Sequence, residues 1–424
     1  MAHIVIVGAG IAGLLCAREL RAKLDAIHAI TLINSTDQFI YTPALNCFSI
    51  AWREIDDITF SLSEALTGEN INFLAIEAHS IALDSQEIQL SDKSVVPFDY
   101  LVLATGAVEQ QMLASSTQSF SNYSVGNAQA LKEHYQHFVT RHFDANQGVD
   151  KQAVAQQSIC EVVVSALQPT SHIVKAYELI FLLDADLRRR SLRENVKLTL
   201  LTHESEPGEL GLSGVGDSIQ LIKTALKQRD INVFCAINSY RYQAEKLYIV
   251  KGESTDDQRD ITFHAPFHMD FPALKAADFL IKTQLLTDEN GNLSIDKTCR
   301  TKASQRVYAI GDCVALEHGS EHEFYALKPS ELLCESMVNA VTQNICSDIN
   351  NTSSDVKFKT NAIGLIQMGR EAAAYAAIPY TTPRSTSYFE IEEWLHYAKQ
   401  RYDKQFLERL RGGEKTTSRI KDKR

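Results

Sequence analysis

The chain begins with a glycine pattern that few folds accommodate. Residues 3–20 read HIVIVGAGIAGLLCAREL, an apolar strand followed by Gly8, Gly10 and Gly13 in the spacing GxGxxG and then by a helical pattern. The first glycine permits a tight turn, the second lets a pyrophosphate approach the backbone, and the third lets helix and strand pack closely. The N–H groups at the helix start favour bound phosphate. In this strand-turn-helix context the pattern predicts a Rossmann-like dinucleotide site.

The second strand of this unit lacks the acidic residue that usually binds a ribose. The segment AITLINSTDQ ends its apolar part at Asn34, and Asp37 follows three residues later. An amide side chain both donates and accepts hydrogen bonds, so Asn34 can bind a ribose hydroxyl. Asp37 is the alternative for this role.

Two later strands indicate which dinucleotide binds. Their ends read Ala104-Thr105-Gly106, after residues 98–103, and Gly311-Asp312, after residues 306–310. Taken separately, these ends also fit a plain strand-end turn and a helix N-cap. Together with the first turn, in this order, they are typical of flavoproteins with two dinucleotide-binding domains. They therefore predict FAD, with Asp312 accepting a hydrogen bond from a cofactor hydroxyl.

The composition excludes several classes of protein. The chain has 424 residues, of which 45% are hydrophobic and 22% charged, and its formal net charge is −11. This length accommodates two or three domains, and the acidic balance argues against nucleic acid as a partner. No apolar run is long enough to span a bilayer, and we expect no secretory leader. The eight cysteines form no CxxC pair and the histidines lack metal-ligand spacing, so we expect reduced thiols, no metal and a cytoplasmic location.

A second strand-to-helix segment lies at residues 161–190. Val162 to Val164 form a β-branched run, and Ala176 to Leu187 favour a helix, but the turn between them, residues 165–172, has no glycine. A flavoenzyme that takes hydride from a nicotinamide would place a glycine-rich turn here. The segment therefore argues against NADH as the electron donor.

Residues 41–62 resemble the sulfide:quinone oxidoreductase family. They read YTPALNCFSIAWREIDDITFSL and contain the family pattern of Pro43, Trp52, Arg53 and a strand at Asp57–Phe60. The resemblance continues, in order, through residues 176–190, 209–218, 335–345 and 361–379. It therefore covers nearly the whole chain.

This resemblance implies an α/β protein with two Rossmann-like dinucleotide-binding domains and a C-terminal segment. The FAD-binding domain would be split, at residues 1–115 and 290–360, around a second dinucleotide-binding-like domain at residues 116–289 that lacks its nicotinamide site. Residues 361–424 would form a C-terminal segment that contacts a membrane. The resemblance also implies FAD as the cofactor and a quinone as the electron acceptor.

The chain departs from the family at its sulfur-handling residues. Aligned on the shared Ala-Tyr-Glu motif, one redox cysteine falls on His172, and the other falls on Gly364. A third family cysteine falls near Tyr123, a histidine beside it on Asn127, and the histidine of a Gly-His-Leu-Gly motif on Glu209. Because neither histidine nor glycine forms a persulfide, these departures argue against sulfide as the donor and leave the donor open.

Three residues are candidates for catalysis. His172 is a proton relay beside the flavin, since histidine titrates near neutral pH, or a polar residue at a helix start. Glu209 is a buried general base or an exposed loop carboxylate. Lys328 lies one residue before the position of a flavin-adjacent lysine in the family, and is otherwise a surface lysine. Cys47 and Cys334 are the cysteines that could replace the missing pair, or are buried inert thiols.

The end of the chain predicts an amphipathic helix with a basic tail. Within residues 387–413, apolar side chains recur at i, i+3, i+4 spacing, namely Ile391, Leu395, Ala398, Tyr402, Phe406 and Leu410. From residue 395 to 424 the chain has ten Lys or Arg and four Asp or Glu. Such a segment can lie on an anionic membrane, here the inner face of the cell membrane, or pack on the flavin domain.

These features predict an FAD-dependent oxidoreductase that passes electrons through the flavin to a quinone. The missing cysteines favour one alternative, a flavin-binding subunit or sensor without catalysis. A further alternative is NADH:quinone reduction, against which the glycine-free second turn argues. The oligomeric state is left open.

Overall fold

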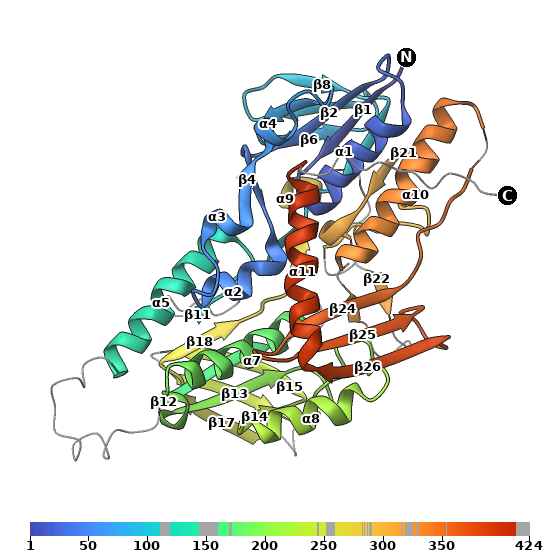
Figure 1. The fold of residues 1–424 in the computed structure, drawn as a ribbon. Helices are drawn as coiled ribbons and strands as arrows, with labels where there is room; N and C mark the ends of the chain where they lie inside the picture. Colours follow the sequence, from blue (N-terminus) through green and yellow to red (C-terminus); the bar gives the residue numbers. More distant parts are fainter. Residues whose placement is uncertain are drawn as a thin grey trace.

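The expected α/β class with two Rossmann-like units is confirmed. The structure is a computed structural model that describes residues 1–110, 119–143, 160–168, 172–243, 246–251, 259–281, 283, 285, 287, 291–314, 316–318, 325–327, 330–352 and 354–412. Two parallel β-sheets lie at opposite ends of the molecule, each covered by helices, and a third, antiparallel sheet packs beside them (Figure 1).

The first sheet is built around the N-terminal strand. Its strand order is β20-β21-β9-β1-β2-β5, in which β20 alone pairs antiparallel. The bounds are β1 (His3–Val7), β2 (Ala29–Asn34), β5 (Asn72–Ala75), β9 (Tyr100–Leu103), β20 (Arg300–Thr301) and β21 (Ser304–Ala309). Helices α1 (Ile11–Lys23) and α10 (Glu331–Ile349) pack on each other beside it. Since β9 and β21 are neighbours, the ends of two strands two hundred residues apart lie together.

Shorter elements surround this first unit. An antiparallel ribbon of β6, β7 and β8 and a hairpin of β3 and β4 extend from it. Their bounds, with the short helices between them, are β3 (Gln38–Ile40), η1 (Thr42–Ala44), α2 (Leu45–Ser49), α3 (Ile55–Ile58), β4 (Thr59–Ser61), α4 (Leu62–Ala65), β6 (Ala78–Ala82), β7 (Glu87–Leu90) and β8 (Val95–Pro97).

The second unit repeats the parallel plan with the order β11-β18-β12-β13-β14. Its elements are β11 (Ser119–Phe120), α5 (Val125–Phe143), β12 (Cys160–Ala166), α7 (Ile173–Arg189), η3 (Arg193–Asn195), β13 (Val196–Thr202), α8 (Ser218–Gln228), β14 (Ile231–Phe234) and β18 (Phe267–Asp270). An antiparallel sheet of β15 (Ile237–Gln243), β16 (Lys246–Lys251) and β17 (Arg259–His264) adjoins it. The strands of the parallel sheet are buried on both faces, because α7 packs on one face and the antiparallel sheet packs on the other, against Val163 and Leu201.

The chain passes between the two units along a two-stranded ribbon. Strand β10 (Ala107–Glu109) leaves the first unit and pairs antiparallel with β19 (Leu274–Ala276), which returns to it. After the return come α9 (Asp278–Ile281), η4 (Gly311–Cys313), β22 (Leu316–His318) and β23 (Tyr325–Leu327). The first sheet therefore takes strands from both sides of the second unit in sequence.

The C-terminal part is an antiparallel sheet followed by one helix. Strands β24 (Ala362–Gln367), β25 (Ala372–Ile378) and β26 (Thr386–Glu392) precede α11 (Glu393–Leu410), which runs between the two units in Figure 1. The expectation that residue 391 belongs to a helix is wrong, because residues 386–392 pair with β25. Their alternating, aromatic-rich pattern suits a strand better than a helix.

The apolar side chains of the C-terminal helix pack on the rest of the protein, as one of the two expectations for it requires. Leu395, Phe406 and Leu410 are buried, and the Arg18 side chain of α1 donates to the Leu410 carbonyl at 2.6 Å. Residues 413–424, the basic tail, lie outside the described residues. Over the part of the chain that the structure describes, every helix is too short or too polar to cross a membrane.

Candidate active site

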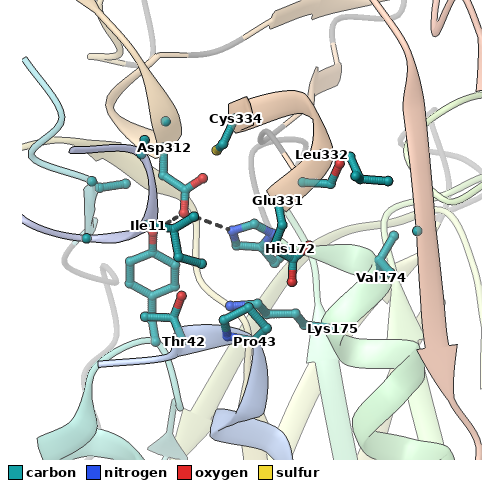
Figure 2. Close-up of a pocket in the computed structure, with 18 of the residues that line it drawn as sticks. Ile11, Thr42, Pro43, His172, Val174, Lys175, Asp312, Glu331, Leu332 and Cys334 are labelled. Atoms are coloured by element: carbon teal, nitrogen blue, oxygen red, sulfur yellow. Dashed lines mark hydrogen bonds and ion pairs between the residues drawn. The ribbon is translucent and has the colours of Figure 1, made fainter. Parts of the chain in front are cut away.

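A cavity of about 810 Å³ lies where the two units and the C-terminal sheet meet. Its walls come from the first glycine turn, the start of α7, η4, the start of α10, and β24, β25 and α11. Figure 2 shows the part of it between α7 and α10. Segments far apart in sequence therefore converge on one space.

The first glycine turn is closed to side chains at two positions and open at the third. A Cβ on Gly8, whose φ is +99°, would lie 2.2 Å from the Ala104 carbonyl oxygen, and one on Gly13 would lie 1.8 Å from the Gly8 carbonyl oxygen. A Cβ on Gly10 would meet no atom within 4 Å, and Gly10 lines the cavity. Space is thus left where a pyrophosphate would meet the start of α1.

The end of the second strand supports this turn. The Asn34 side-chain oxygen accepts from the Ala9 N–H at 3.0 Å, and its amide donates to the Thr36 carbonyl at 2.9 Å. Asn34 lines the cavity. The alternative, Asp37, accepts from the Ser61 and Ser63 hydroxyls, and these bonds hold its pKa low although slight burial opposes them. Asp37 is not among the cavity-lining residues.

The predicted cofactor residues of the later strands lie on the same wall. Ala104, Thr105, Gly106, Gly311 and Asp312 all line the cavity. A Cβ on Gly311, whose φ is +75°, would press on α1 at 3.3 Å from the Ala12 Cβ. The three turns therefore surround one dinucleotide-sized space, which fits FAD.

Asp312 connects the cofactor turn to the second unit. Its carboxylate accepts from the Tyr123 hydroxyl at 2.8 Å and lies 3.8 Å from the Nε2 atom of His172 (Figure 2). The Tyr123 and His172 rings stack at 5.8 Å. Burial and the neighbouring Asp312 carboxylate raise the pKa of Tyr123, so its hydroxyl keeps its proton. The structure thus brings His172 together with the predicted flavin residue Asp312.

Three charged residues of this cavity were missed by sequence reasoning. Lys175 and Glu178 lie on the first turns of α7, and Lys399 lies on α11. Glu178 accepts from the Asn46 amide at 2.8 Å and the Gln367 N–H at 3.1 Å, and burial raises its pKa. The signal that could have found Glu178 and Lys175 is a pair of charges in the apolar first half of a helix.

Lys399 lies beside two carboxylates. Its ammonium lies 3.4 Å from Asp403 and 4.0 Å from Glu178. Burial lowers the pKa of Lys399, but Asp403 and Glu178 outweigh burial and raise it overall. It therefore remains a cation that balances these two acids.

The position of the second family cysteine is filled by another side chain. Gly364 of β24 pairs across the sheet with Tyr375 of β25, and both line the cavity. A Cβ on Gly364 would lie 2.5 Å from the Tyr375 hydroxyl oxygen. The phenol ring therefore covers the face of the strand from which a cysteine would project.

The other candidates lie in different places. Glu209 is half-buried, accepts from the Ser205 N–H at 3.1 Å and does not line the cavity. Lys328 lies outside the described residues. Cys334 lines the cavity, but burial first and the Asp312 carboxylate second raise its pKa, which disfavours a thiolate. Cys47 lies on α2 away from the cavity lining, and burial raises its pKa to about 12.

The second unit has a buried acid just after its second parallel strand. Two residues after β13, Glu204 is fully buried and accepts from the Tyr177 hydroxyl at 2.6 Å and from the Gly211 N–H at 3.0 Å. Burial raises the pKa of Glu204 to about 8. These contacts hold the Glu204 side chain against α7. Residues 169–171 of the turn lie outside the described residues.

The comparisons with known proteins agree with this geometry. Residues 2–159 match the family model described as pyridine nucleotide-disulphide oxidoreductase. The chain is 25% identical to the sulfide-quinone reductase of Aquifex aeolicus over 421 residues, which cover 97% of this chain and 91% of that protein.

Solved structures show the same fold. The sulfide:quinone oxidoreductase of Aquifex aeolicus superposes with a TM-score of 0.88 at 24% identity, covering 99% of this chain and 93% of that one. NDH2 of Plasmodium falciparum in complex with NADH gives a TM-score of 0.72 at 12% identity, over 97% and 96%. FAD, the cofactor of this family, is the group that the three turns would hold. The chain is thus a homologue of sulfide-quinone reductase, and its residues 2–159 match the pyridine nucleotide-disulphide oxidoreductase family.

Proposed function

We propose that this protein oxidises a donor other than sulfide through FAD and passes the electrons to a quinone. The observation that carries the proposal is the shared cavity. It joins the three cofactor turns to a tyrosine-lined chamber formed by the C-terminal sheet and α11. Bound FAD would supply two-electron storage between a donor and an acceptor that need not meet.

The tyrosine-lined chamber suits a quinone. Tyr375, Tyr388 and Tyr402 line it from β25, β26 and α11. Aromatic rings pack against a flat ring, and a phenol can donate to a quinone oxygen. Burial raises the pKa of Tyr375 and of Tyr402, so both hydroxyls keep the proton that such a bond requires.

Two residues have the chemistry for moving protons. Reduction of a quinone to a quinol consumes two electrons and two protons, which the donor and its surroundings release. Glu178 is a buried carboxyl group beside Lys399 whose pKa is raised by burial, and a carboxyl group in this position can take up and return a proton. His172, between Asp312 and the cavity, is the second relay.

The donor is not expected to be sulfide. His172 and Gly364 occupy the two cysteine positions of the family, and Tyr375 fills the space in front of Gly364. Cys334 is the cysteine of the described chain that lines the cavity, and its raised pKa disfavours nucleophilic attack. NADH is the second candidate, favoured by the fold shared with the NADH complex of NDH2 and opposed by the glycine-free turn at residues 165–172.

The test separates donor from acceptor. Under nitrogen, the flavin absorbance of the FAD-loaded chain is recorded after addition of sulfide, and in parallel after NADH. We expect no bleaching by either. The flavin is then reduced with dithionite, and a short-chain ubiquinone is added; reoxidation by the quinone is expected. Tyr375→Phe, which keeps the ring and loses the hydroxyl, should slow this step, whereas the exposed Tyr397→Phe should not.

Each half of the proposal can fail on its own. Bleaching by sulfide would show that Cys334 or another group replaces the missing pair. Bleaching by NADH within seconds would make the protein an NADH:quinone reductase. Failure of the quinone to reoxidise reduced flavin would remove the acceptor and favour a flavin-binding subunit or sensor.

A quinone acceptor in turn favours contact with a membrane, because long-chain quinones reside there. Trp394 and Tyr397 of α11 are 59% and 69% exposed, and Tyr388, which lines the chamber, is 45% exposed. Aromatic side chains of this kind favour a membrane interface. We expect Trp394→Ser with Tyr397→Ser to reduce sedimentation of the protein with anionic lipid vesicles; equal sedimentation would exclude this surface.

A further inference from the structure

Lys175 is a lysine of the cavity with no carboxylate partner of its own. Among the described residues, its ammonium forms no ion pair or hydrogen bond. The ammonium nitrogen lies over the Tyr123 ring, 5.4 Å from the ring centre. Lys399 in the same cavity has Asp403 and Glu178, and Lys132 has Glu54 at 2.7 Å. Lys175 therefore brings a charge that the fold does not neutralise by contact.

The acids nearest Lys175 are engaged elsewhere. Asp312 accepts from Tyr123, and Glu178 accepts from Asn46 and Gln367 and lies beside Lys399. Figure 2 shows the Lys175 side chain extending across the cavity floor below His172 and toward the side on which Asp312 lies. The ammonium thus points into the space between α7 and the cofactor turns.

Position 175 is also part of the motif in which the chain departs from its relatives. Lys175 follows His172 by three residues and directly precedes the Ala-Tyr-Glu motif at 176–178. A lysine on an apolar helix start is not needed for helix stability, because a cation at a helix N-terminus opposes the dipole. Helix stability therefore does not explain Lys175, whereas a role in the cavity would.

We propose that Lys175 is the cation that stabilises the added negative charge of reduced FAD in this cavity and so raises its reduction potential. This inference rests on the part of the proposed function that assigns FAD as the cofactor. It does not depend on the proposed donor or acceptor. Two-electron reduction adds negative charge to a flavin, and a nearby cation in a poorly solvated cavity lowers the free energy of that state.

The charge of Lys175 is set by the groups that face it. Burial lowers its pKa, whereas Asp312 of η4, Glu178 of α7 and Glu331 of α10 raise it and Lys399 of α11 lowers it. His172 and Tyr123 complete the surroundings. The cation is present below the pKa of Lys175 and is lost as the pH rises through it.

The experiment measures the midpoint potential of the FAD-loaded full chain and needs no natural donor. Wild type, Lys175→Met and Lys175→Arg are each equilibrated with a reference dye during slow enzymatic reduction under nitrogen. Lys175→Met should shift the equilibrium toward oxidised flavin about tenfold, which is about 30 mV for a two-electron couple. Lys175→Arg, which keeps the charge, should stay near wild type.

A matched control separates cavity charge from net charge. Lys223→Met removes one cation from α8 of the same unit, where Lys223 pairs with Glu206 at 2.6 Å on the surface. It should leave the potential unchanged, because water screens it. An unchanged potential in Lys175→Met, or an equal shift in Lys223→Met, would overturn the inference.

The pH dependence gives a readout that a structural role would not produce. At low pH the midpoint potential of the wild type should equal that of Lys175→Arg, and at high pH it should equal that of Lys175→Met. The reason is that lysine deprotonates as the pH rises and arginine does not. If Lys175→Met does not bind FAD, the wild type and Lys175→Arg still test the inference. Parallel profiles of midpoint potential against pH in these two proteins would show that the charge of Lys175 does not act on the flavin. Loss of quinone reoxidation with this pattern intact would instead refute the proposed acceptor.

Discussion

The two strand-turn-helix segments of this protein share a plan and differ in where they leave space. At the first turn, a side chain on Gly8 or Gly13 would strike the backbone, while Gly10 faces open cavity. At the second, the turn at residues 165–172 has no glycine, and the buried acid Glu204 after the next strand is bound to Tyr177 of α7. The same fold therefore keeps its first turn open toward the cavity and packs a buried acid against the helix in its second unit.

The difference extends to the sulfur chemistry. At Gly364 the place of a cysteine side chain is taken by Tyr375. The absence of this cysteine from the sequence thus coincides with occupied space in the structure. Restoring a single residue should not restore the corresponding function.

The largest effect should come from the closed glycine of the open site. Gly13→Ala places a Cβ 1.8 Å from the Gly8 carbonyl oxygen, so helix α1 must move away from β1. We expect a loss of about 3 kcal/mol or more in unfolding free energy, together with loss of bound FAD. Urea unfolding and the flavin absorbance of the purified protein measure the two.

Gly10→Ala is the matched control, because its Cβ meets no protein atom within 4 Å. It should keep the unfolding free energy of the cofactor-free chain within about 1 kcal/mol and weaken FAD binding only. If both variants destabilise the apo chain equally, the space at Gly10 is not reserved for a ligand.

The second prediction concerns the buried acid Glu204 of the second unit. The pKa of Glu204 is raised to about 8 by burial, above its unfolded value, so the folded state holds a proton that the unfolded state releases. Stability from this group is therefore complete at acidic pH and falls as the pH rises toward about 8. Glu204→Gln, which stays neutral, should gain about 2 kcal/mol on wild type between pH 5 and pH 8, measured by urea unfolding.

Glu206→Gln serves as the control for this pH dependence. Glu206 is an exposed carboxylate paired with Lys223, two residues from Glu204. Its substitution should leave the slope of stability against pH unchanged. A wild-type slope equal to that of Glu204→Gln would mean that Glu204 is ionised in the fold and that burial does not raise its pKa.

The third prediction tests the filled cysteine position. Gly364→Cys brings a Cβ to 2.5 Å from the Tyr375 hydroxyl oxygen, so the ring must shift. We expect a destabilisation of about 1–3 kcal/mol, and relief of part of it by a second change, Tyr375→Ala. Thermal unfolding of the single and double variants measures the coupling; additive effects would show that the ring does not hold the cysteine space.

The first turn could be predicted from sequence because its chemistry is local. Glycine spacing, strand and helix pattern lie within residues 3–20, and the structure places Gly8 and Gly10 between β1 and α1 and Gly13 on the first turn of α1. The strand ends at Gly106 and Gly311 were recognised because their sequences are typical of flavoproteins. Both glycines line the same cavity as the first turn. Local backbone requirements of this kind are readable in one sequence.

The charged part of the cavity could not be predicted in the same way. Lys175, Glu178 and Lys399 meet only because α7 and α11 pack beside β24, and no local pattern reports that contact. Glu209 was chosen by alignment alone and lies outside the cavity lining, whereas the neighbouring Glu204 is the buried acid. Residue 391 was assigned to a helix because apolar spacing in short segments fits both periods.

The smallest effect should come from the second strand of the open site, and it sharpens the comparison with Glu204. Asn34 closes no space: it ties the Ala9 N–H and the Thr36 carbonyl together and leaves the turn in place for a ligand. Asn34→Ala removes both bonds, so the turn loses its support and FAD should bind about five- to tenfold more weakly, which is about 1 kcal/mol. Fluorescence titration of the apo chain with FAD measures this loss. Asn34→Asp, which can still accept from Ala9, should lie between Asn34→Ala and wild type. If Asn34→Ala binds FAD as tightly as wild type, Asn34 is a bystander and the glycines alone keep the first site open.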